Sequence, residues 1–102
     1  MPVKLLMTWD ILSGREQEYF EFVVREWIPT MQRIGLEPND AWVTVYGSSN
    51  QPQIAAAAQT VDLAEMRRIL ETSDWRDLTG RLLEFVENFE YKVVEAKPGF
   101  QM

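Results

Sequence analysis

The sequence has neither cysteine nor histidine, and these two absences exclude much of the familiar chemistry of enzymes. Without cysteine there are no disulfides, no thiolate nucleophiles and no Cys-ligated zinc or iron–sulfur sites. Without histidine there is no Ser-His-Asp triad, no His-ligated haem and no imidazole base at neutral pH. We therefore expect no cofactor and no metal site.

Long apolar runs, glycine clusters and excess basic charge are also missing. No stretch approaches the roughly 18 apolar residues of a membrane-spanning helix, and the amino terminus does not resemble a signal peptide. The five glycines are isolated, so there is no phosphate-binding loop. Ten Lys and Arg stand against sixteen Asp and Glu, and the net charge of -6 repels a phosphate backbone. We expect a cytoplasmic protein that binds neither membranes nor nucleic acids.

The residues that are present predict one α+β domain over 1–102, with the element order βαββαβ and a single core. Strands are expected at Val3–Leu12, Ala41–Tyr46, Gln53–Thr60 and Phe89–Ala96, with the second and third forming a hairpin. One helix should start after Ser13 and run to about Ile34. A second should run from Asp62 to about Glu87, with a break at Thr72–Ser73.

Local signals define the ends of these helices. Two pairs have capping-box spacing, Ser13 with Glu16 and Asp62 with Glu65. Pro29 has no amide hydrogen and crowds the preceding turn, which predicts a kink near residues 25–27. Gly35 is a natural carboxyl-terminal cap.

The expected sheet is apolar on both faces, although two helices can cover only one of them. The first strand offers Leu5 and Met7 on one side and Leu6 on the other. Burying about 500 Å² on each subunit, at ~25 cal/mol per Å², supplies on the order of 25 kcal/mol before association costs. We therefore expect a homodimer through the helix-free face, with Met7 at the seam. The alternative is a monomer with an apolar sheet surface.

Several short segments resemble the dimeric α+β barrel superfamily, and most closely its NIPSNAP-like members. These segments are Thr8–Gly14, Trp27–Pro29, Gly35, Leu70–Trp75 and Glu90–Pro98, and together they span nearly the whole chain. The resemblance implies two ferredoxin-like subunits packed sheet against sheet, with small molecules bound between sheet and helices. It implies no particular reaction. Family patterns place a His and an aromatic residue on the third strand, where this sequence has Ala56 and Ala58, so His-dependent chemistry is not expected.

The run Ala55–Ala58 predicts either a filled or a hollow region, because alanine occupies little volume. Large side chains such as Trp9 or Trp27 fill the space in one interpretation, and a flat apolar ligand fills it in the other. Asp10 is either a proton acceptor beside Trp9 or a solvated strand end. The candidate ligand-binding residues are Trp9, Asp10, Trp27, Trp42, Tyr46, Ala56 and Ala58.

The composition and the resemblance together favour a homodimer that binds a small apolar or aromatic molecule between sheet and helices. The alternative is a cofactor-independent monooxygenase, or a related small enzyme, acting on an aromatic or polyketide-like substrate. Such enzymes activate oxygen with the substrate's own carbanion and need neither histidine nor metal.

Overall fold

The computed structural model describes residues 2–43 and 54–95, and within them it confirms an α+β fold with the order βαββαβ. The strands are β1 (Val3–Ile11), β2 (Glu37–Val43), β3 (Ile54–Thr60) and β4 (Val86–Glu95). The first helical segment consists of α1 (Glu16–Phe22), a π-helical turn η1 (Val23–Trp27) and α2 (Ile28–Ile34), and the second consists of α3 (Leu63–Leu70) and α4 (Ser73–Leu82).

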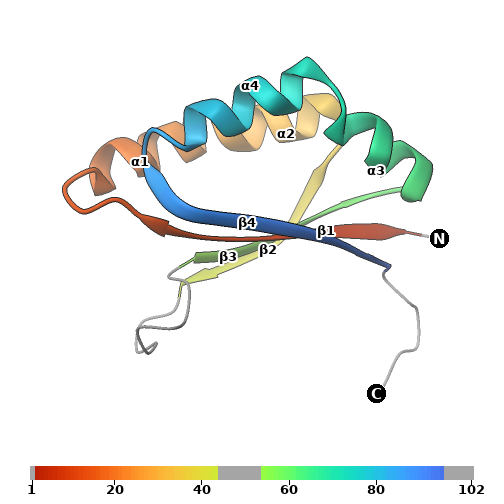
Figure 1. Ribbon diagram of the computed structural model, residues 1–102, viewed down its shortest axis with the longest axis horizontal. Helices are drawn as coiled ribbons and strands as arrows, with labels where there is room; N and C mark the ends of the chain where they lie inside the picture. The colour runs from red at the N-terminus through yellow and green to blue at the C-terminus, as the bar shows by residue number, and fades with distance from the viewer. Residues whose placement is uncertain (1, 44–53, 96–102) are drawn as a thin grey trace.

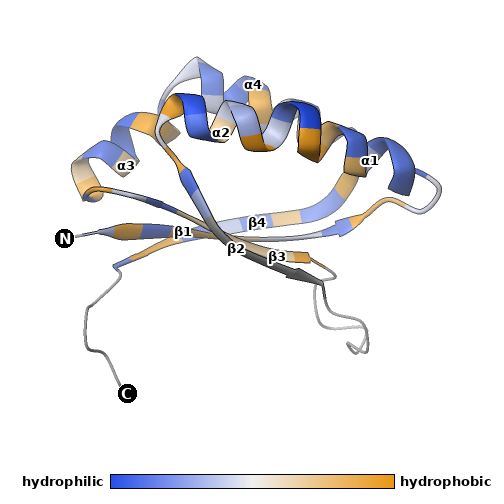
Figure 2. Cartoon of the chain, turned by 180° about the vertical axis from the view of Figure 1, so that it is seen from behind, coloured by the Kyte–Doolittle hydropathy of each residue, from blue (hydrophilic) through white to orange (hydrophobic). Residues whose placement is uncertain are grey.

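The four strands form one antiparallel sheet in the order β2-β3-β1-β4 (Figure 1). Strand β1 is central, with Leu5 opposite Ala58 of β3 and Val93 of β4. Strands β2 and β3 are paired as the expected hairpin. All the helices lie on one side of the sheet, so its other face has no helix over it (Figures 1 and 2).

The core lies between the sheet and the helices. Along β1 every second residue is buried, starting at Val3 and ending at Ile11, because strand side chains alternate between the two faces. The helices contribute residues from their sheet-facing sides, and hydrophobic and hydrophilic residues alternate along them (Figure 2). The buried helical side chains are Tyr19, Phe22, Trp27, Met31, Met66, Ile69, Trp75, Leu78 and Leu82.

The irregularity expected before Pro29 takes the form of the π-helical turn η1, in which the Ile28 amide donates to the Val23 carbonyl. Proline cannot supply the amide that a regular helix needs at its position, so the preceding turn is rearranged. Gly35 ends α2 with φ of 106°, and the Leu36 amide donates to the Met31 carbonyl at 2.8 Å. The predicted glycine cap is confirmed, with the hydrogen bond of a Schellman motif.

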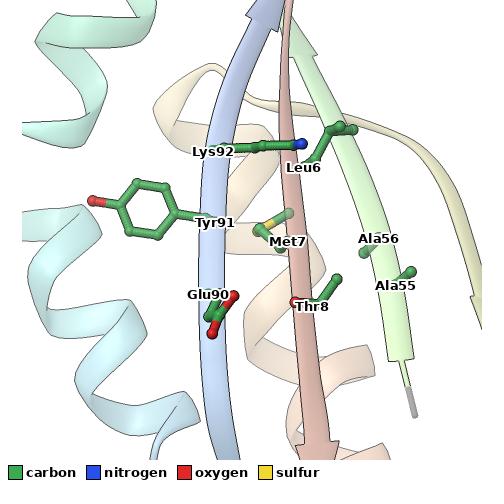
Figure 3. Close-up of a pocket in the computed structure, with 8 residues that line it drawn as sticks. All are labelled: Leu6, Met7, Thr8, Ala55, Ala56, Glu90, Tyr91 and Lys92. Carbon is green, nitrogen blue, oxygen red and sulfur yellow. The ribbon is translucent and has the colours of Figure 1, made fainter. Parts of the chain in front are cut away.

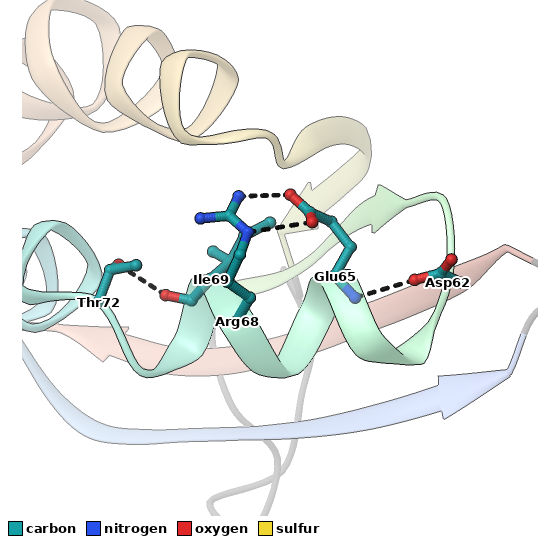
Figure 4. A network of polar contacts seen from close by, with 5 residues as sticks. All are labelled: Asp62, Glu65, Arg68, Ile69 and Thr72. Carbon is teal, nitrogen blue, oxygen red and sulfur yellow. Dashed lines mark hydrogen bonds and ion pairs between the residues drawn. The ribbon is translucent and has the colours of Figure 1, made fainter.

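The two expected capping boxes differ in outcome. Asp62 caps α3 by accepting a hydrogen bond from the Glu65 amide at 2.9 Å, while the Glu65 carboxylate pairs with Arg68 (Figure 4). Ser13 does not cap α1: the cap is Arg15, which makes no side-chain cap hydrogen bond. The break at Thr72 is confirmed, because its hydroxyl donates to the Ile69 carbonyl at 2.7 Å and accepts from the Trp75 amide at 3.2 Å.

Three predicted boundaries are wrong, and one of them is the start of the last strand, since β4 begins at Val86 rather than at Phe89. Helix α4 ends at Leu82 rather than near Glu87, because Val86 already pairs with Ile11 as the first residue of β4. Strand β2 begins at Glu37 rather than at Ala41, and a register shift follows Pro38. Proline is tolerated there because β2 is an edge strand.

Candidate functional site

Aromatic side chains occupy the space between the sheet and the helices. The Trp9 ring, 2% exposed, lies 5.7 Å from the Trp27 ring and 5.9 Å from the Phe89 ring. Its indole Nε1 donates a 2.9 Å hydrogen bond to the Tyr19 hydroxyl. Burial raises the pKa of the Tyr19 phenol above its ordinary value, and the hydrogen bond from Trp9 opposes this rise. These aromatic rings are therefore packed against one another, and the buried polar atoms of Trp9 and Tyr19 satisfy each other.

The alanine strand is divided between the two faces of the sheet. Ala58 is fully buried and Ala56 is packed against the core, so both lie on the helix side. Ala55 and Ala57 lie on the opposite side, because strand side chains alternate. Trp42 pairs with Ala55 through the backbone, and Tyr46 lies outside the described residues. Of the candidate residues, the structure brings Trp9, Trp27, Ala56 and Ala58 together in the core, and a ligand on them remains a prediction.

Asp10 is separated from that group. It follows Trp9 on β1, so its side chain lies on the helix-free face while the Trp9 ring lies in the core. Its Oδ2 accepts a 3.0 Å hydrogen bond from Asn88 Nδ2. Asn88 has φ of 59° and lies where the pairing of β4 with β1 shifts by one residue, as in a β-bulge.

The helix-free face differs from the expected one in two ways. Met7 is 1% exposed beneath the helices, so the expectation that it lies at the seam is wrong. The face is also mixed rather than uniformly apolar. Strand β1 contributes Lys4, Leu6, Thr8 and Asp10 to it, β3 contributes Ala55, Ala57 and Gln59, and β4 contributes Glu87, Glu90, Lys92 and Val94.

A hollow of about 500 Å³ lies on this face, across β4, β1 and β3. Its lining residues are Leu6, Met7, Thr8, Ala55, Ala56, Glu90, Tyr91 and Lys92 (Figure 3). Leu6, Thr8 and Ala55 form a largely apolar floor, and Glu90 and Lys92 stand beside it on β4. Tyr91 points away from the hollow, towards the edge of the sheet and α4 (Figure 3).

The two charged residues of the hollow are held in register with its floor. Glu90 lies opposite Thr8, and Lys92 lies opposite Leu6. Within residues 2–43 and 54–95 the salt bridges join helical residues and the Arg15 cap, and neither Glu90 nor Lys92 takes part in one. Both groups are therefore available to a ligand or a partner.

Sequence reasoning missed Glu90. It does offer Lys4 and Lys92 as a pair on neighbouring strands that attracts an anionic substrate, with exposed surface lysines as the alternative, and it includes Ala55 in the run that is either filled or hollow. Charged residues alternating with Phe89, Tyr91 and Val93 did signal that one face of β4 is polar. The sequence did not indicate that this polar side meets Leu6, because the pairing register of distant strands is not a local property.

The described residues contain neither a cluster of metal ligands nor a helix suited to span a membrane. No group of three or more Asp or Glu is placed to hold a metal ion. None of the described helices has the length and apolar character needed to cross a membrane.

Comparison with known proteins defines the fold. Neither the protein-family models nor the curated proteins include a match to the sequence. Among solved structures, a NIPSNAP family protein from Agrobacterium tumefaciens is 19% identical, with a TM-score of 0.71 over 97% of this chain and 96% of that chain. A dimeric ferredoxin-like protein of unknown function from Thermobifida fusca is 9% identical, with a TM-score of 0.65 over 94% and 92% of the two chains.

A third similar structure is that of a proposed antibiotic biosynthesis monooxygenase from Bacteroides thetaiotaomicron. It is 19% identical, with a TM-score of 0.60 over 99% of this chain and 95% of that chain. The chain therefore has a ferredoxin-like α+β fold, similar to those of the NIPSNAP family protein and the dimeric ferredoxin-like protein. At sequence identities this low, structural similarity establishes a shared fold but not a shared activity.

Proposed function

We propose that this chain is a single cytoplasmic domain that forms a homodimer through its helix-free face and binds a small amphipathic molecule in the hollow there. The observation that carries the proposal is the hollow itself, whose apolar floor is bordered by Glu90 and Lys92. The site that we propose is on the opposite side of the sheet from the one expected from the sequence, because Trp9, Trp27 and their neighbours pack against one another beneath the helices.

The size and lining of the hollow suit a flat ligand with one anionic group. A volume of about 500 Å³ falls within the range of small-molecule sites, which are mostly apolar with a few placed polar groups. The floor of the hollow has no aromatic side chain among Leu6, Thr8 and Ala55, so a flat ligand can lie against it. Lys92 offers an ammonium group to a carboxylate, sulfonate or enolate oxygen at the edge of that surface.

A second subunit supplies the missing cover. The hollow is open on the side away from the helices, and an open apolar floor binds a ligand weakly because water remains in contact with it. A second sheet closes the hollow and removes that water. The dimeric ferredoxin-like protein with a similar fold supports this arrangement.

A second candidate is a cofactor-independent oxygenase, and the presence of both a carboxylate (Glu90) and an ammonium (Lys92) in the lining of the hollow favours it. A carboxylate accepts a proton from an acidic C–H group, and a nearby ammonium stabilises the resulting enolate. Oxygen consumption with a 1,3-diketone probe tests this candidate, and Glu90→Gln should abolish the turnover. Uptake that is equal in the wild type and in Glu90→Gln contradicts it.

The binding proposal is tested with the anionic aromatic dye 1-anilinonaphthalene-8-sulfonate. We expect saturable fluorescence enhancement with the folded wild type, and at least a tenfold loss of affinity in Ala55→Phe, because the ring occupies the floor. The matched control is Ala64→Phe, which adds the same ring on the exposed surface of α3. Thermal unfolding of each variant verifies that it is folded.

Two results contradict the proposal. The first is dye affinity in Ala55→Phe equal to that in Ala64→Phe. The second is a wild type that remains monomeric in sedimentation equilibrium at concentrations far above the micromolar range, since the hollow then stays open.

A further inference from the structure

The hollow on the helix-free face has one carboxylate and one ammonium at a fixed spacing. Glu90 and Lys92 are two residues apart on β4, so their side chains leave the same face of the strand with Cα atoms about 7 Å apart. Both are exposed, and both line the hollow. Figure 3 shows the Lys92 ammonium extended over β1 beside Leu6, and the Glu90 carboxylate at the level of Thr8. The hollow therefore presents a positive and a negative group at two successive levels.

The surface between these two levels and the middle of the sheet is uncharged. On β1, Leu6 lies opposite Lys92 and Thr8 lies opposite Glu90. The residues of β3 at the same two levels are both alanines, Ala57 and Ala55. A molecule that lies on this surface therefore meets charge along β4 and not beneath it.

The charges next to the hollow on β1 and β4 have the same signs as those that line it. Lys4 lies one level beyond Lys92, and Asp10 and Glu87 lie one level beyond Glu90. The positive level of the hollow is thus flanked by a further positive group, and the negative level by further negative ones. These neighbours leave the order of the signs unchanged.

The acidic edge of the sheet at β2 is distant from the charged side of the hollow. Glu37 is paired with Gln59, and the Asp40 position is paired with Ala57, at the level of Lys92. Strand β2 is three strands from β4 in the order β2-β3-β1-β4. At ~4.8 Å for each strand this separation is about 14 Å, which exceeds the ~8 Å screening length at physiological salt. The β2 charges therefore act only weakly on Lys92.

A ligand with a single charge satisfies only one of the two lining groups. An anion that pairs with Lys92 is also close to the Glu90 carboxylate, which repels it, and a cation beside Glu90 is likewise repelled by Lys92. A ligand that has both charges at a matching distance makes two attractive contacts instead. Each of these contacts is a charge-assisted hydrogen bond, which is stronger than one between neutral groups.

We propose that the hollow binds a flat zwitterion, with a cationic group and an anionic group at opposite ends of an aromatic ring. The cationic group pairs with Glu90, the anionic group pairs with Lys92, and the ring lies on Leu6 and Thr8. This inference rests on the proposed binding function and specifies its ligand class by adding a cationic group to the anionic one. An α-amino acid does not match the site, because its two charges share one carbon atom and cannot reach both levels.

Four related probes test the ligand class. The zwitterion is 4-(aminomethyl)benzoate, while 4-methylbenzoate and 4-methylbenzylamine keep the ring with one charge each, and L-phenylalanine has both charges on one carbon. Displacement of 1-anilinonaphthalene-8-sulfonate from the wild type at physiological salt gives the affinity of each probe. The zwitterion should bind roughly tenfold more tightly than each of the other three, because it alone makes both charged hydrogen bonds.

Single substitutions separate the contributions of the two charges. In Glu90→Gln the zwitterion should lose its advantage over 4-methylbenzoate, and in Lys92→Gln it should lose its advantage over 4-methylbenzylamine. The matched controls are Glu71→Gln and Arg67→Gln, which change the net charge in the same way at exposed positions in and just after α3. Both controls should bind the four probes as the wild type does, and thermal unfolding verifies that each variant is folded.

The orientation of the bound zwitterion provides a second readout. In the wild type, the methylene group of the probe should give nuclear Overhauser contacts to Thr8, which lies opposite Glu90. The exchanged variant Glu90→Lys/Lys92→Glu keeps the net charge and both lining groups but reverses their order. The probe should bind it with near wild-type affinity in the opposite orientation, with its methylene contacts at Leu6.

The contrary outcomes distinguish this inference from the function on which it rests. If the wild type binds a probe with one charge, or L-phenylalanine, as tightly as the zwitterion, the ligand class is wrong and the proposed binding site stands. An unchanged orientation of the probe in a folded exchanged variant leads to the same conclusion. A wild type that binds neither the dye nor any of the four probes overturns both proposals.

Discussion

Removal of the Tyr19 hydroxyl tests whether the buried pair of Tyr19 and Trp9 holds the core together. The two side chains are 4% and 2% exposed, and the donor and acceptor are 2.9 Å apart. Tyr19→Phe keeps the ring but leaves the indole N–H without its acceptor. An unsatisfied buried donor costs about 1–3 kcal/mol, whereas a hydroxyl lost from an exposed tyrosine costs almost nothing.

The expected change in melting temperature follows from the size of the chain. For a domain of 60–100 residues, 1 kcal/mol shifts the midpoint by about 4–8 °C, so a cost of about 1–3 kcal/mol for Tyr19→Phe should lower it by roughly 4–24 °C. The matched control is Tyr91→Phe, since Tyr91 is 48% exposed at the sheet edge. Circular dichroism melts and urea titrations give the midpoint and the free energy of unfolding.

A double-mutant cycle separates the hydrogen bond from packing. Trp9→Phe alone also creates a cavity, so its cost exceeds that of Tyr19→Phe. With Trp9 already replaced, Tyr19→Phe should cost about 1 kcal/mol less than it does in the wild type, because the orphaned N–H is no longer present. If Tyr19→Phe and Tyr91→Phe have the same stability, the hydrogen bond is not what stabilises this part of the core.

Two further predictions concern the core. Met7→Glu should lower the free energy of unfolding by roughly 3 kcal/mol or more, because it buries an unpaired carboxylate under the helices. Leu6→Glu, on the other face, should leave the melting temperature nearly unchanged and weaken only the dimer. A folded, monomeric Met7→Glu protein would show that the faces of β1 are assigned wrongly. The pH dependence concerns Tyr19, whose raised pKa in the folded state means that the unfolded chain releases its proton first as the pH rises. The stability linked to Tyr19 is therefore fully present below about pH 10 and is lost above it. Above about pH 10, the urea midpoint should fall more steeply with pH for the wild type than for Tyr19→Phe. The same dependence of the midpoint on pH in both proteins would contradict the burial of the phenol.

The sequence by itself determined the elements and several of their ends. Alternation in Val3–Ile11 and the apolar spacing that indicates a helix before Ile34 depend only on near neighbours. The buried side of that helix was predicted only in part, since Trp27 and Met31 are buried but Phe20 and Val24 are exposed. The Asp62 cap, the break at Thr72 and the rearranged turn before Pro29 also depend only on near neighbours, since each is a hydrogen bond made or missing within one turn. The prediction that Ser13 caps α1 was wrong. Sequence spacing alone does not fix the backbone path into the helix, and here the helix begins two residues later, with Arg15 at the cap position.

Only the tertiary structure decided which face of the sheet is covered and what the other face carries. Both Met7 and Leu6 are apolar, so composition alone does not say which of them the helices cover. The hollow depends on Glu90 and Lys92 meeting Thr8 and Leu6 across more than eighty residues of chain, and no local pattern specifies that register. Strand side chains alternate with a period of two, so a slip of one residue exchanges the two faces, and only the packing of the whole core selects one.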